Sequence, residues 1–483
     1  MGRLETALSS FERALVVDTN HFQSLAEKCE TLTELGRFIE LSENCNPSAV
    51  TVREENAAQT RVEQCGELPD DRANPLVINT GLQVTVLCYE RALAGSSQDV
   101  TLWVQQGLAL EQLGQFERAA TAFTQAIELN PNHAIALVHY CGVLNQLQNY
   151  ETALETCDRA FQVEGGLETW KAAYGLNQRS IALLGLQQYD EALAAANQAI
   201  EIESRYAPAW NSRALSLWWL NQGDAVVAID QAIAKYDQAL ESYDRAEVSS
   251  QTAAVTLRET FERSYPDSLM MLYRGRILAL SNKGRILASQ QEYDRAIQEG
   301  YSRALALYEY AVSNAKMSPL DRAMLSEIWT NRAVAHLHRR NFSAALTSTQ
   351  RALALDQDSF AAWYNRGLAF SLFSSVRDES DDARNDAECA FDAYSEANQI
   401  DPGNINVLIG QGLALESLGA VEAAIAQFER VLSLDANNTL AQQRREALVD
   451  QLWATSTIGN VRVNNLQTLP SVPVSRCREN LAN

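Results

Sequence analysis

Apolar and small side chains recur along most of this chain with the spacing of amphipathic helices. Trp103, Gly107 and Leu110 form one stripe, and Ala119 with Phe123 begins a second stripe after a short polar interval. Intervals of three or four residues place each stripe on one face of a helix. The pattern therefore predicts two antiparallel helices joined by a tight turn.

The same pattern returns about every 34 residues, which indicates an array of equal units. The frames that fit it are 100–133, 134–167, 173–206, 326–359 and 405–438. One helical hairpin cannot bury its apolar faces alone, whereas stacked hairpins share a continuous core. The chain is thus expected to be all-α and built by stacking.

Insertions and irregular stretches interrupt this array. One hairpin resumes only near Thr85, which leaves 39–82 as a loop-rich insertion, and another resumes at Ala390 after an acidic insertion at 374–387. A third begins at Ala207 and resumes at Tyr236. Two longer helical patterns then follow, so this middle part is expected to contain lengthened, irregular hairpins.

The two ends of the array differ from its interior. Residues 1–21 fit only the second helix of a hairpin, 439–453 fit a capping helix, and 454–483 show no helical stripe and are expected to be a disordered tail. We expect the missing first helix to lie upstream of residue 1, the alternative being a docked insertion. The expected segments are 1–21 (half repeat), 22–99 (interrupted repeat), 100–206 (regular repeats), 207–325 (lengthened repeats), 326–438 (repeats with the acidic insertion), 439–453 (cap) and 454–483 (tail).

The repeated unit resembles the tetratricopeptide repeat, whose pattern is W-x2-L-G-x2-Y…A-x3-F…P. The residues that carry the resemblance in the first regular frame are Trp103, Gly107, Ala119, Phe123 and Pro131. Gln106 stands where leucine is usual. The resemblance implies a right-handed superhelix, an α-solenoid of about ten helix-turn-helix units, some with long insertions.

In proteins of this family the first helix of each unit lines a concave groove that holds the ligand. The resemblance places these side chains in the groove: Asn331, Asn365, Tyr364, Gln105, His139, Gln178, Asn211 and Trp218. Asn331 and Asn365 stand at the same place in consecutive units. An amide offers a donor and an acceptor to a peptide bond, so the pair resembles a ladder for an extended peptide. The alternative is that asparagine is simply common at this position of the repeat in the family.

Arginine follows that groove position in several units, as in Arg179, Arg276 and Arg366. We expect the aliphatic part of each side chain to pack between helices and the guanidinium group to reach an acidic neighbour. Capture of an anion is the alternative. The lysine-containing clamp of chaperone-binding repeats is not matched.

Charge and cysteine content narrow the classes of partner and compartment. The 483 residues carry 39 Lys and Arg against 61 Asp and Glu, a net charge of −22 that repels nucleic acid and favours a basic partner. No window predicts direct membrane insertion. The eight cysteines include no C-x-x-C pair, which predicts buried, reduced thiols and a cytoplasmic location.

No residue pattern predicts catalysis. The five histidines fit no metal or nucleophile motif, and the acidic run 378–388 lacks the Gly and Glu of an EF-hand and is expected to be a solvated loop. No cofactor and no metal are expected. The sequence favours a non-catalytic scaffold or adaptor that binds a protein or peptide. The alternatives are a regulatory or substrate-recruiting arm of an enzyme, such as a glycosyltransferase or kinase, whose catalytic part lies elsewhere, and self-association.

Overall fold

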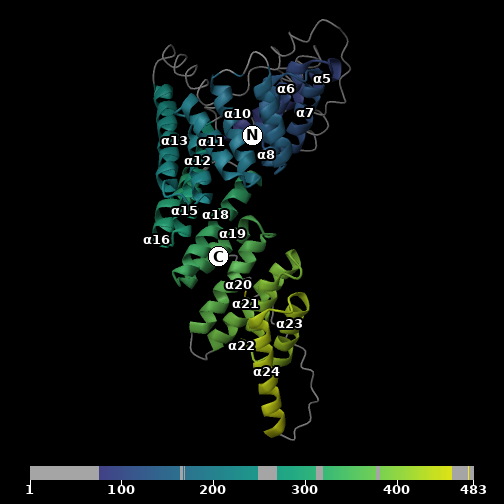
Figure 1. Cartoon of the computed structure of the whole chain (residues 1–483), viewed down its shortest axis with the longest axis vertical. Helices are drawn as coiled ribbons and strands as arrows, with labels where there is room; N and C mark the ends of the chain where they lie inside the picture. Colours follow the sequence, from purple (N-terminus) through teal and green to yellow (C-terminus); the bar gives the residue numbers. More distant parts are fainter. Residues whose placement is uncertain are drawn as a thin grey trace, which may run out of the picture. The chain divides into compact units, whose positions relative to one another are not determined.

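The computed structural model is helical throughout the residues it describes, which contain no strand (Figure 1). The described residues are 75–163, 167, 169–248, 269–311, 319–376, 381–458 and 477. The predicted half repeat 1–21 and most of the predicted insertion 39–82 lie outside them. Two compact units are formed, Met1–Asn282 with Leu307–Lys316 and Lys283–Ala306 with Met317–Asn483, and each is described by itself.

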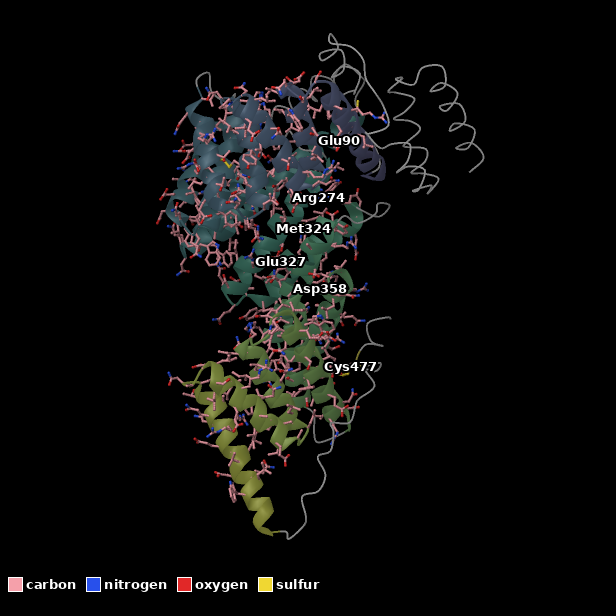
Figure 2. All side chains as sticks on the ribbon, turned by 90° about the vertical axis from the view of Figure 1, so that its right-hand side faces the viewer. Glu90, Arg274, Met324, Glu327, Asp358 and Cys477 are labelled. Atoms are coloured by element: carbon pink, nitrogen blue, oxygen red, sulfur yellow. A yellow bond between two sulfur atoms is a disulfide. The ribbon has the colours of Figure 1, made fainter. Side chains whose placement is uncertain are left out.

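The first unit contains hairpins of nearly regular length. Its helices are α5 (Pro75–Gly95), α6 (Val100–Gln112), α7 (Phe116–Leu129), α8 (Ala134–Gln146), α9 (Tyr150–Gln162), α10 (Thr169–Gly185), α11 (Tyr189–Ile202), α12 (Ala207–Trp219), α13 (Ala225–Val248) and α15 (Leu269–Ser289), the last of which continues into the second unit. Helix α5 begins ten residues before Thr85, so the end of the predicted insertion is helical. Glu90 of α5, labelled in Figure 2, forms an ion pair with Arg118 of α7.

The second unit begins with a distorted hairpin and continues with regular ones. Its helices are α16 (Tyr293–Arg295), the π-helix η2 (Ala296–Tyr301), α17 (Ser302–Ala311, which ends in the first unit), α18 (Pro319–His338), α19 (Phe342–Leu355), α20 (Phe360–Val376), α21 (Asp381–Ile400), α22 (Ile405–Ser417), α23 (Val421–Leu434) and α24 (Thr439–Ile458).

A left-handed residue ends the first helix of most hairpins. Gly114 and Gly419 adopt φ values of 70° and 73°, and the N–H group of Gln115 donates back to the Leu110 carbonyl, as in a Schellman turn. Residues other than glycine take the same backbone conformation in the other hairpin turns: Gln148, Gln187, Asn221, Gln291 and Arg340. The turn geometry is therefore repeated even where the glycine is not.

Within a hairpin, a small residue of the first helix faces a large ring of the second. A Cβ atom on Gly107 would lie 2.6 Å from the Phe123 ring, and one on Gly412 would lie 2.8 Å from the Phe428 ring. Both rings are fully buried. This pairing of a small residue with an aromatic ring sets how closely the two helices approach.

The repeated tryptophan links neighbouring hairpins. The indole N–H groups of Trp103, Trp210 and Trp363 donate to the carbonyls of Ser97, Ser204 and Gln357, at 2.9, 2.9 and 2.8 Å. Each acceptor lies in the turn that precedes the tryptophan's own helix. Each indole therefore fixes the entry of the chain into a first helix.

The hairpin that begins at Ala207 does not contain the interruption predicted before Tyr236. Helix α13 is continuous from Ala225, so no insertion precedes Tyr236. Tyr236 of α13 packs against α15, where a Cβ on Gly275 would lie 2.5 Å from the tyrosine hydroxyl. The α12–α13 hairpin is lengthened by extending its second helix to 24 residues, and not by a loop.

A π-helix explains why the repeat frame loosens after residue 250. Gly284 faces Tyr301 as Gly107 faces Phe123, but the two residues are one position farther apart in sequence. The π-helix η2 absorbs this extra residue in the second helix of the hairpin. Lys283 lies 2.9 Å from Glu299 on η2, and hydrogen bonds from Arg295 and then Lys283 lower the pKa of Glu299 to about 2.

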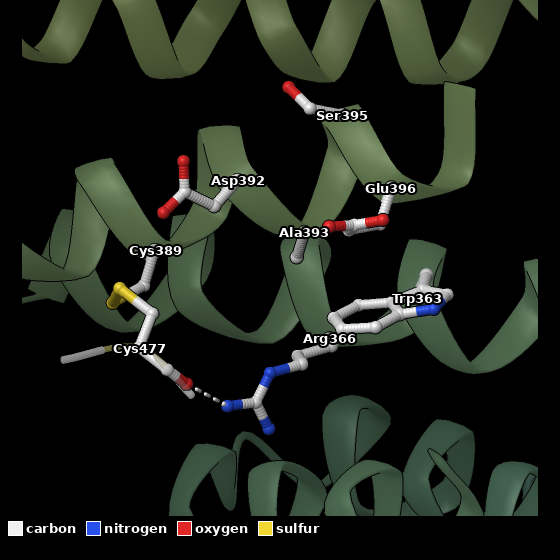
Figure 3. A pocket seen from close by; sticks show the side chains of 8 residues that line it. All are labelled: Trp363, Arg366, Cys389, Asp392, Ala393, Ser395, Glu396 and Cys477. Atoms are coloured by element: carbon white, nitrogen blue, oxygen red, sulfur yellow. Dashed lines mark hydrogen bonds between the residues drawn. A yellow bond between two sulfur atoms is a disulfide. The ribbon is translucent and has the colours of Figure 1, made fainter. Parts of the chain in front are cut away.

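The acidic insertion and the predicted tail are more ordered than expected. Helix α21 begins at Asp381, so most of the acidic run is helical and not a loop. Helix α24 extends to Ile458, beyond the predicted cap. Cys477, inside the predicted disordered tail, forms a disulfide with Cys389 of α21 (Figure 3). The rest of that tail lies outside the described residues.

The prediction of reduced thiols is wrong for the described cysteines. Cys141 is bonded to Cys157, Cys389 to Cys477, and Cys88 is also disulfide-bonded. No free cysteine occurs in the described part of the chain. The prediction was wrong because it relied on the absence of C-x-x-C pairs. The bonded cysteines lie 16 and 88 residues apart in the sequence, and the fold brings them together.

Acidification is expected to destabilise the second unit through His336. This side chain is buried, its Nε2 finds no hydrogen-bond partner among the described residues, and burial, then the nearby Arg332 charge, lowers its pKa. The unfolded chain therefore takes up the proton first, and the free energy of unfolding falls as pH drops below about 6.5. Melting temperatures between pH 7.5 and 5 should depend less on pH in His336→Leu. Equal pH dependence in both proteins would contradict this assignment.

Candidate functional site

The candidate site is the face on which successive first helices meet. In the first unit α8 packs against α6 and α10, and α10 packs against α12. In the second unit α20 packs against α18 and α22. The predicted groove residues stand on these first helices, and their contacts differ between the two units.

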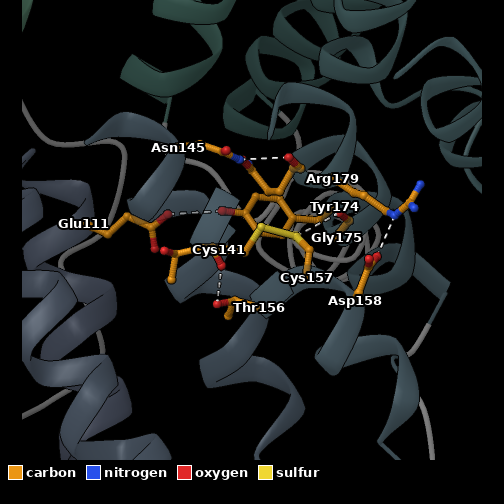
Figure 4. The surroundings of a disulfide bond; sticks show 11 residues. Glu111, Cys141, Asn145, Thr156, Cys157, Asp158, Tyr174, Gly175 and Arg179 are labelled. Atoms are coloured by element: carbon orange, nitrogen blue, oxygen red, sulfur yellow. Dashed lines mark hydrogen bonds and ion pairs between the residues drawn. A yellow bond between two sulfur atoms is a disulfide. The ribbon is translucent and has the colours of Figure 1, made fainter. Parts of the chain in front are cut away.

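A carboxylate connects three first helices of the first unit. Glu111 Oε2 of α6 lies 2.9 Å from His139 Nδ1 of α8, and Glu111 Oε1 accepts a hydrogen bond of 3.1 Å from the Tyr174 hydroxyl of α10 (Figure 4). The His139 and Tyr174 rings lie 5.0 Å apart. A Cβ on Gly142 would meet the Tyr174 hydroxyl at 2.7 Å, so this glycine lets the tyrosine reach past α8. Glu111 and Tyr174 were not among the predicted residues.

Amide and hydroxyl groups continue these contacts along the first unit. The Asn145 amide donates to the Gln178 carbonyl at 2.8 Å. Ser212 donates to the Asn177 side chain at 2.8 Å, and the Asn282 amide donates to the Asn211 side chain at 3.0 Å. The side-chain amide of Gln178 also accepts from Asn145. Gln178, Asn211 and His139, all predicted to bind peptide, thus hold neighbouring first helices together.

The predicted residues of the second unit are not used in this way. Asn331 of α18 is half-buried and Asn365 of α20 is 8% exposed. Neither amide makes a hydrogen bond to a described residue. Tyr364 lies beside Asn365, with its ring 6.1 Å from Phe360 and 6.0 Å from Tyr394. The amides of Asn331 and Asn365 therefore have hydrogen-bonding capacity that no described residue takes up. The aromatic ring of Tyr364 belongs to the residue next to Asn365 in the chain. Gln105 of the first unit also has no hydrogen bond to a described residue.

An aromatic cluster ends the first helix α12. Trp219 is 51% exposed, stacks on Tyr189 at 5.4 Å, and lies 4.9 Å from the ring of Trp218. Trp218, the predicted groove residue, is half-buried. The more exposed indole in this cluster is thus Trp219.

The repeated arginines follow the packing prediction in two units. Arg179 lies 2.7 Å from Asp158 of the preceding second helix, and Arg276 lies 2.6 Å from Asp237. Arg366 differs, because it is almost fully buried and donates to the carbonyl of Cys477 at 3.0 Å. Burial lowers the pKa of Arg366 to about 10.

Other kinds of site find no support in the described residues. They contain no group of three or more His, Cys, Asp or Glu side chains placed to hold a metal ion. No helix within these residues combines the length and apolar character needed to cross a membrane.

Comparison with known proteins identifies the repeats. Family models of the tetratricopeptide repeat match residues 104–165, 330–372 and 405–438. No curated protein matches the sequence. Among solved structures, MamA residues 41 to the end from Desulfovibrio magneticus RS-1 is 16% identical, with a TM-score of 0.31 over 38% of this chain and 96% of that one.

Two further solved structures cover more of this chain. A tetratricopeptide repeat protein from Parabacteroides merdae ATCC 43184 is 17% identical, with a TM-score of 0.36 over 64% of this chain and 98% of that one. The APC/C hetero-tetramer Cut9–Hcn1 is 12% identical, with a TM-score of 0.37 over 92% and 93%. The matched family models and the helical hairpins together show that the chain contains tetratricopeptide repeats.

Proposed function

We propose that this protein is a non-catalytic interaction scaffold that binds an extended peptide or a partner helix on the first-helix face of its second unit. Tetratricopeptide repeats are in general protein-interaction modules, and a solenoid of this kind is typically not catalytic. The observation that carries the proposal is the pair Asn331 and Asn365, whose amides stand at equivalent places on α18 and α20 without hydrogen-bond partners among the described residues.

The chemistry of these side chains suits a peptide backbone. Each amide can donate to a carbonyl and accept from an N–H group, so it recognises the peptide bond and not a particular side chain. Tyr364 adds an aromatic surface next to one of them. Hydrogen bonds to the backbone would supply register and part of the affinity, and contact with the aromatic ring would add to the affinity.

The net charge of −22 supports a basic partner. A basic peptide should then bind more weakly as salt rises, because exposed charges are screened. Self-association stays a prediction that light scattering can test. The cytoplasmic location also stays a prediction, and the disulfides weigh against it, since such bonds form and persist mainly in oxidising compartments.

Replacing both asparagines is expected to weaken peptide binding about tenfold, because each backbone hydrogen bond contributes about 0.5–1.5 kcal/mol. Peptides selected from a displayed random library against the wild-type chain would be measured by fluorescence anisotropy with Asn331→Ala/Asn365→Ala. The matched control is Asn385→Ala/Asn437→Ala, which changes two exposed asparagines elsewhere in the same unit. Unchanged affinity in the first double variant, with its helical content intact, would reject the proposed site.

A further inference from the structure

A residue from the C-terminal part of the chain, Cys477, lines a cavity of the α20–α21 hairpin. Cys477 is bonded to Cys389 across a separation of 88 residues, and its carbonyl accepts a hydrogen bond of 3.0 Å from Arg366. Cys477 is only 8% exposed. The hairpin therefore holds Cys477 of its own chain through a covalent bond to the side chain and a hydrogen bond to the backbone.

Arg366 differs from its equivalents in how its charge is satisfied. Arg179 and Arg276 each meet an aspartate on the preceding second helix. The residue equivalent to Asp158 in the unit before Arg366 is Gln350, which carries no charge. The peptide carbonyl of Cys477 thus stands where the other units place a carboxylate. A buried guanidinium group needs such an acceptor, so Arg366 favours a peptide at this place.

Two acidic side chains of α21 line the same cavity. Asp392 and Glu396 line the cavity of about 90 Å³ beside Arg366 and the disulfide, and Figure 3 shows them on the same helix as Cys389. Asp386 lies one turn before Cys389 on that helix. Asp392 and Glu396 therefore lie beside the place where Cys477 is held.

The charge of the held segment is opposite to that of the helix. Cys477 is preceded by Arg476 and followed by Arg478, so a segment that brings Cys477 to α21 carries two guanidinium groups with it. Opposite charges on a segment and its docking surface speed association and favour the matching segment over others. Charge complementarity therefore adds to the covalent bond and the Arg366 contact.

We propose that the α20–α21 hairpin is a binding site for a basic peptide segment, which the chain's own residues around Cys477 fill while the Cys389–Cys477 disulfide is intact. Reduction by a thiol such as glutathione consumes two thiols, yields one oxidised disulfide and leaves Cys389 and Cys477 as thiols. The site can then exchange its own segment for a basic segment of a partner. The residues that line this site include neither Asn331 nor Asn365.

The first test measures how strongly the acidic helix recruits the Cys477 segment. The full chain is equilibrated with mixtures of reduced and oxidised glutathione, and mass spectrometry quantifies the Cys389–Cys477 disulfide. The double variant Asp392→Asn/Glu396→Gln should lower the equilibrium constant for forming the Cys389–Cys477 disulfide about fivefold at low salt. In 1 M salt it should have little effect on that constant. Glu422→Gln/Glu429→Gln on α23 is the control. An equilibrium constant equal to that of the wild type in the first variant would overturn the charge-based part of the proposal.

The second test asks whether the emptied site binds a separate peptide. Cys477→Ser combined with Arg476→Glu and Arg478→Glu removes the internal occupant and keeps the full chain. A labelled peptide with the sequence PSVPVSRSREN should raise its anisotropy with this variant and not with the oxidised wild type. No binding to the variant, or equal binding to both, would overturn the proposal. Asn331→Ala/Asn365→Ala should leave this binding unchanged, which separates it from the proposed function.

Discussion

Phe123→Ala is expected to lower the free energy of unfolding of the first unit by about 3–5 kcal/mol, one of the largest effects of any single substitution in that unit. The Phe123 ring is fully buried between α6 and its own helix α7, and it fills the space that Gly107 leaves open. Removing it leaves a cavity that a continuous stack of helices closes only in part. Urea unfolding followed by circular dichroism measures the loss.

A double-mutant cycle shows whether the glycine and the ring act as a pair. Gly107→Ala alone should destabilise by about 1–3 kcal/mol, because its Cβ would lie 2.6 Å from the ring. In the double variant Gly107→Ala/Phe123→Ala the clash is absent, so the losses should not add. Phe161→Ala, at a ring that is 37% exposed, is the control and should cost much less. Additive losses would contradict the pairing.

The regular hairpins were predictable because their determinants are local. Trp103, Gly107 and Phe123 lie within one repeat, and their spacing alone sets which faces meet. The same holds for the turn at Gly114, where a left-handed backbone favours glycine. A periodic pattern therefore predicted element type, order and core together.

The middle of the chain shows what periodicity misses. One additional residue between Gly284 and Tyr301 broke the frame in the sequence, whereas the helix absorbed it as a π-helix and kept the small-to-aromatic contact. The acidic segment that begins α21 was taken for a loop because charge obscured its helical stripe. Both differences arise because tertiary packing decides between local alternatives that the sequence leaves close in energy.

The sequence placed the candidate residues on first helices, but it did not reveal which of them contact one another. Groove positions follow from the repeat frame, but which amides are free depends on partners far away in sequence. Glu111 is 28 residues from His139 and 63 residues from Tyr174. One signal was present, since Glu111 occupies the same frame position as Trp218, which was singled out. Applying that position to every unit would have found the carboxylate.

Reduction is expected to destabilise the α8–α9 hairpin by about 3 kcal/mol. Cys141 and Cys157 stand where Gly107 and Phe123 stand in the preceding unit, so the disulfide replaces a packed glycine–aromatic pair. It closes a loop with a sequence separation of 16, for which loss of the constraint costs about 3 kcal/mol. Dithiothreitol reduces the other disulfides as well, so the loss of stability has to be measured locally. Amide hydrogen exchange of α8 and α9 with and without dithiothreitol provides that measurement. Unchanged exchange after reduction would contradict the prediction.

A designed variant separates the effect of the covalent bond from that of packing. Cys141→Gly/Cys157→Phe copies the pair that the preceding unit uses and should make the exchange of α8 and α9 insensitive to dithiothreitol. Cys141→Ala/Cys157→Ala removes the bond without filling the space, and it should exchange faster than the designed variant under all conditions. If the two variants exchange alike, packing at this place adds nothing and the bond alone holds the hairpin. If the designed variant matches the oxidised wild type, one repeat position can be closed either by a ring or by a disulfide.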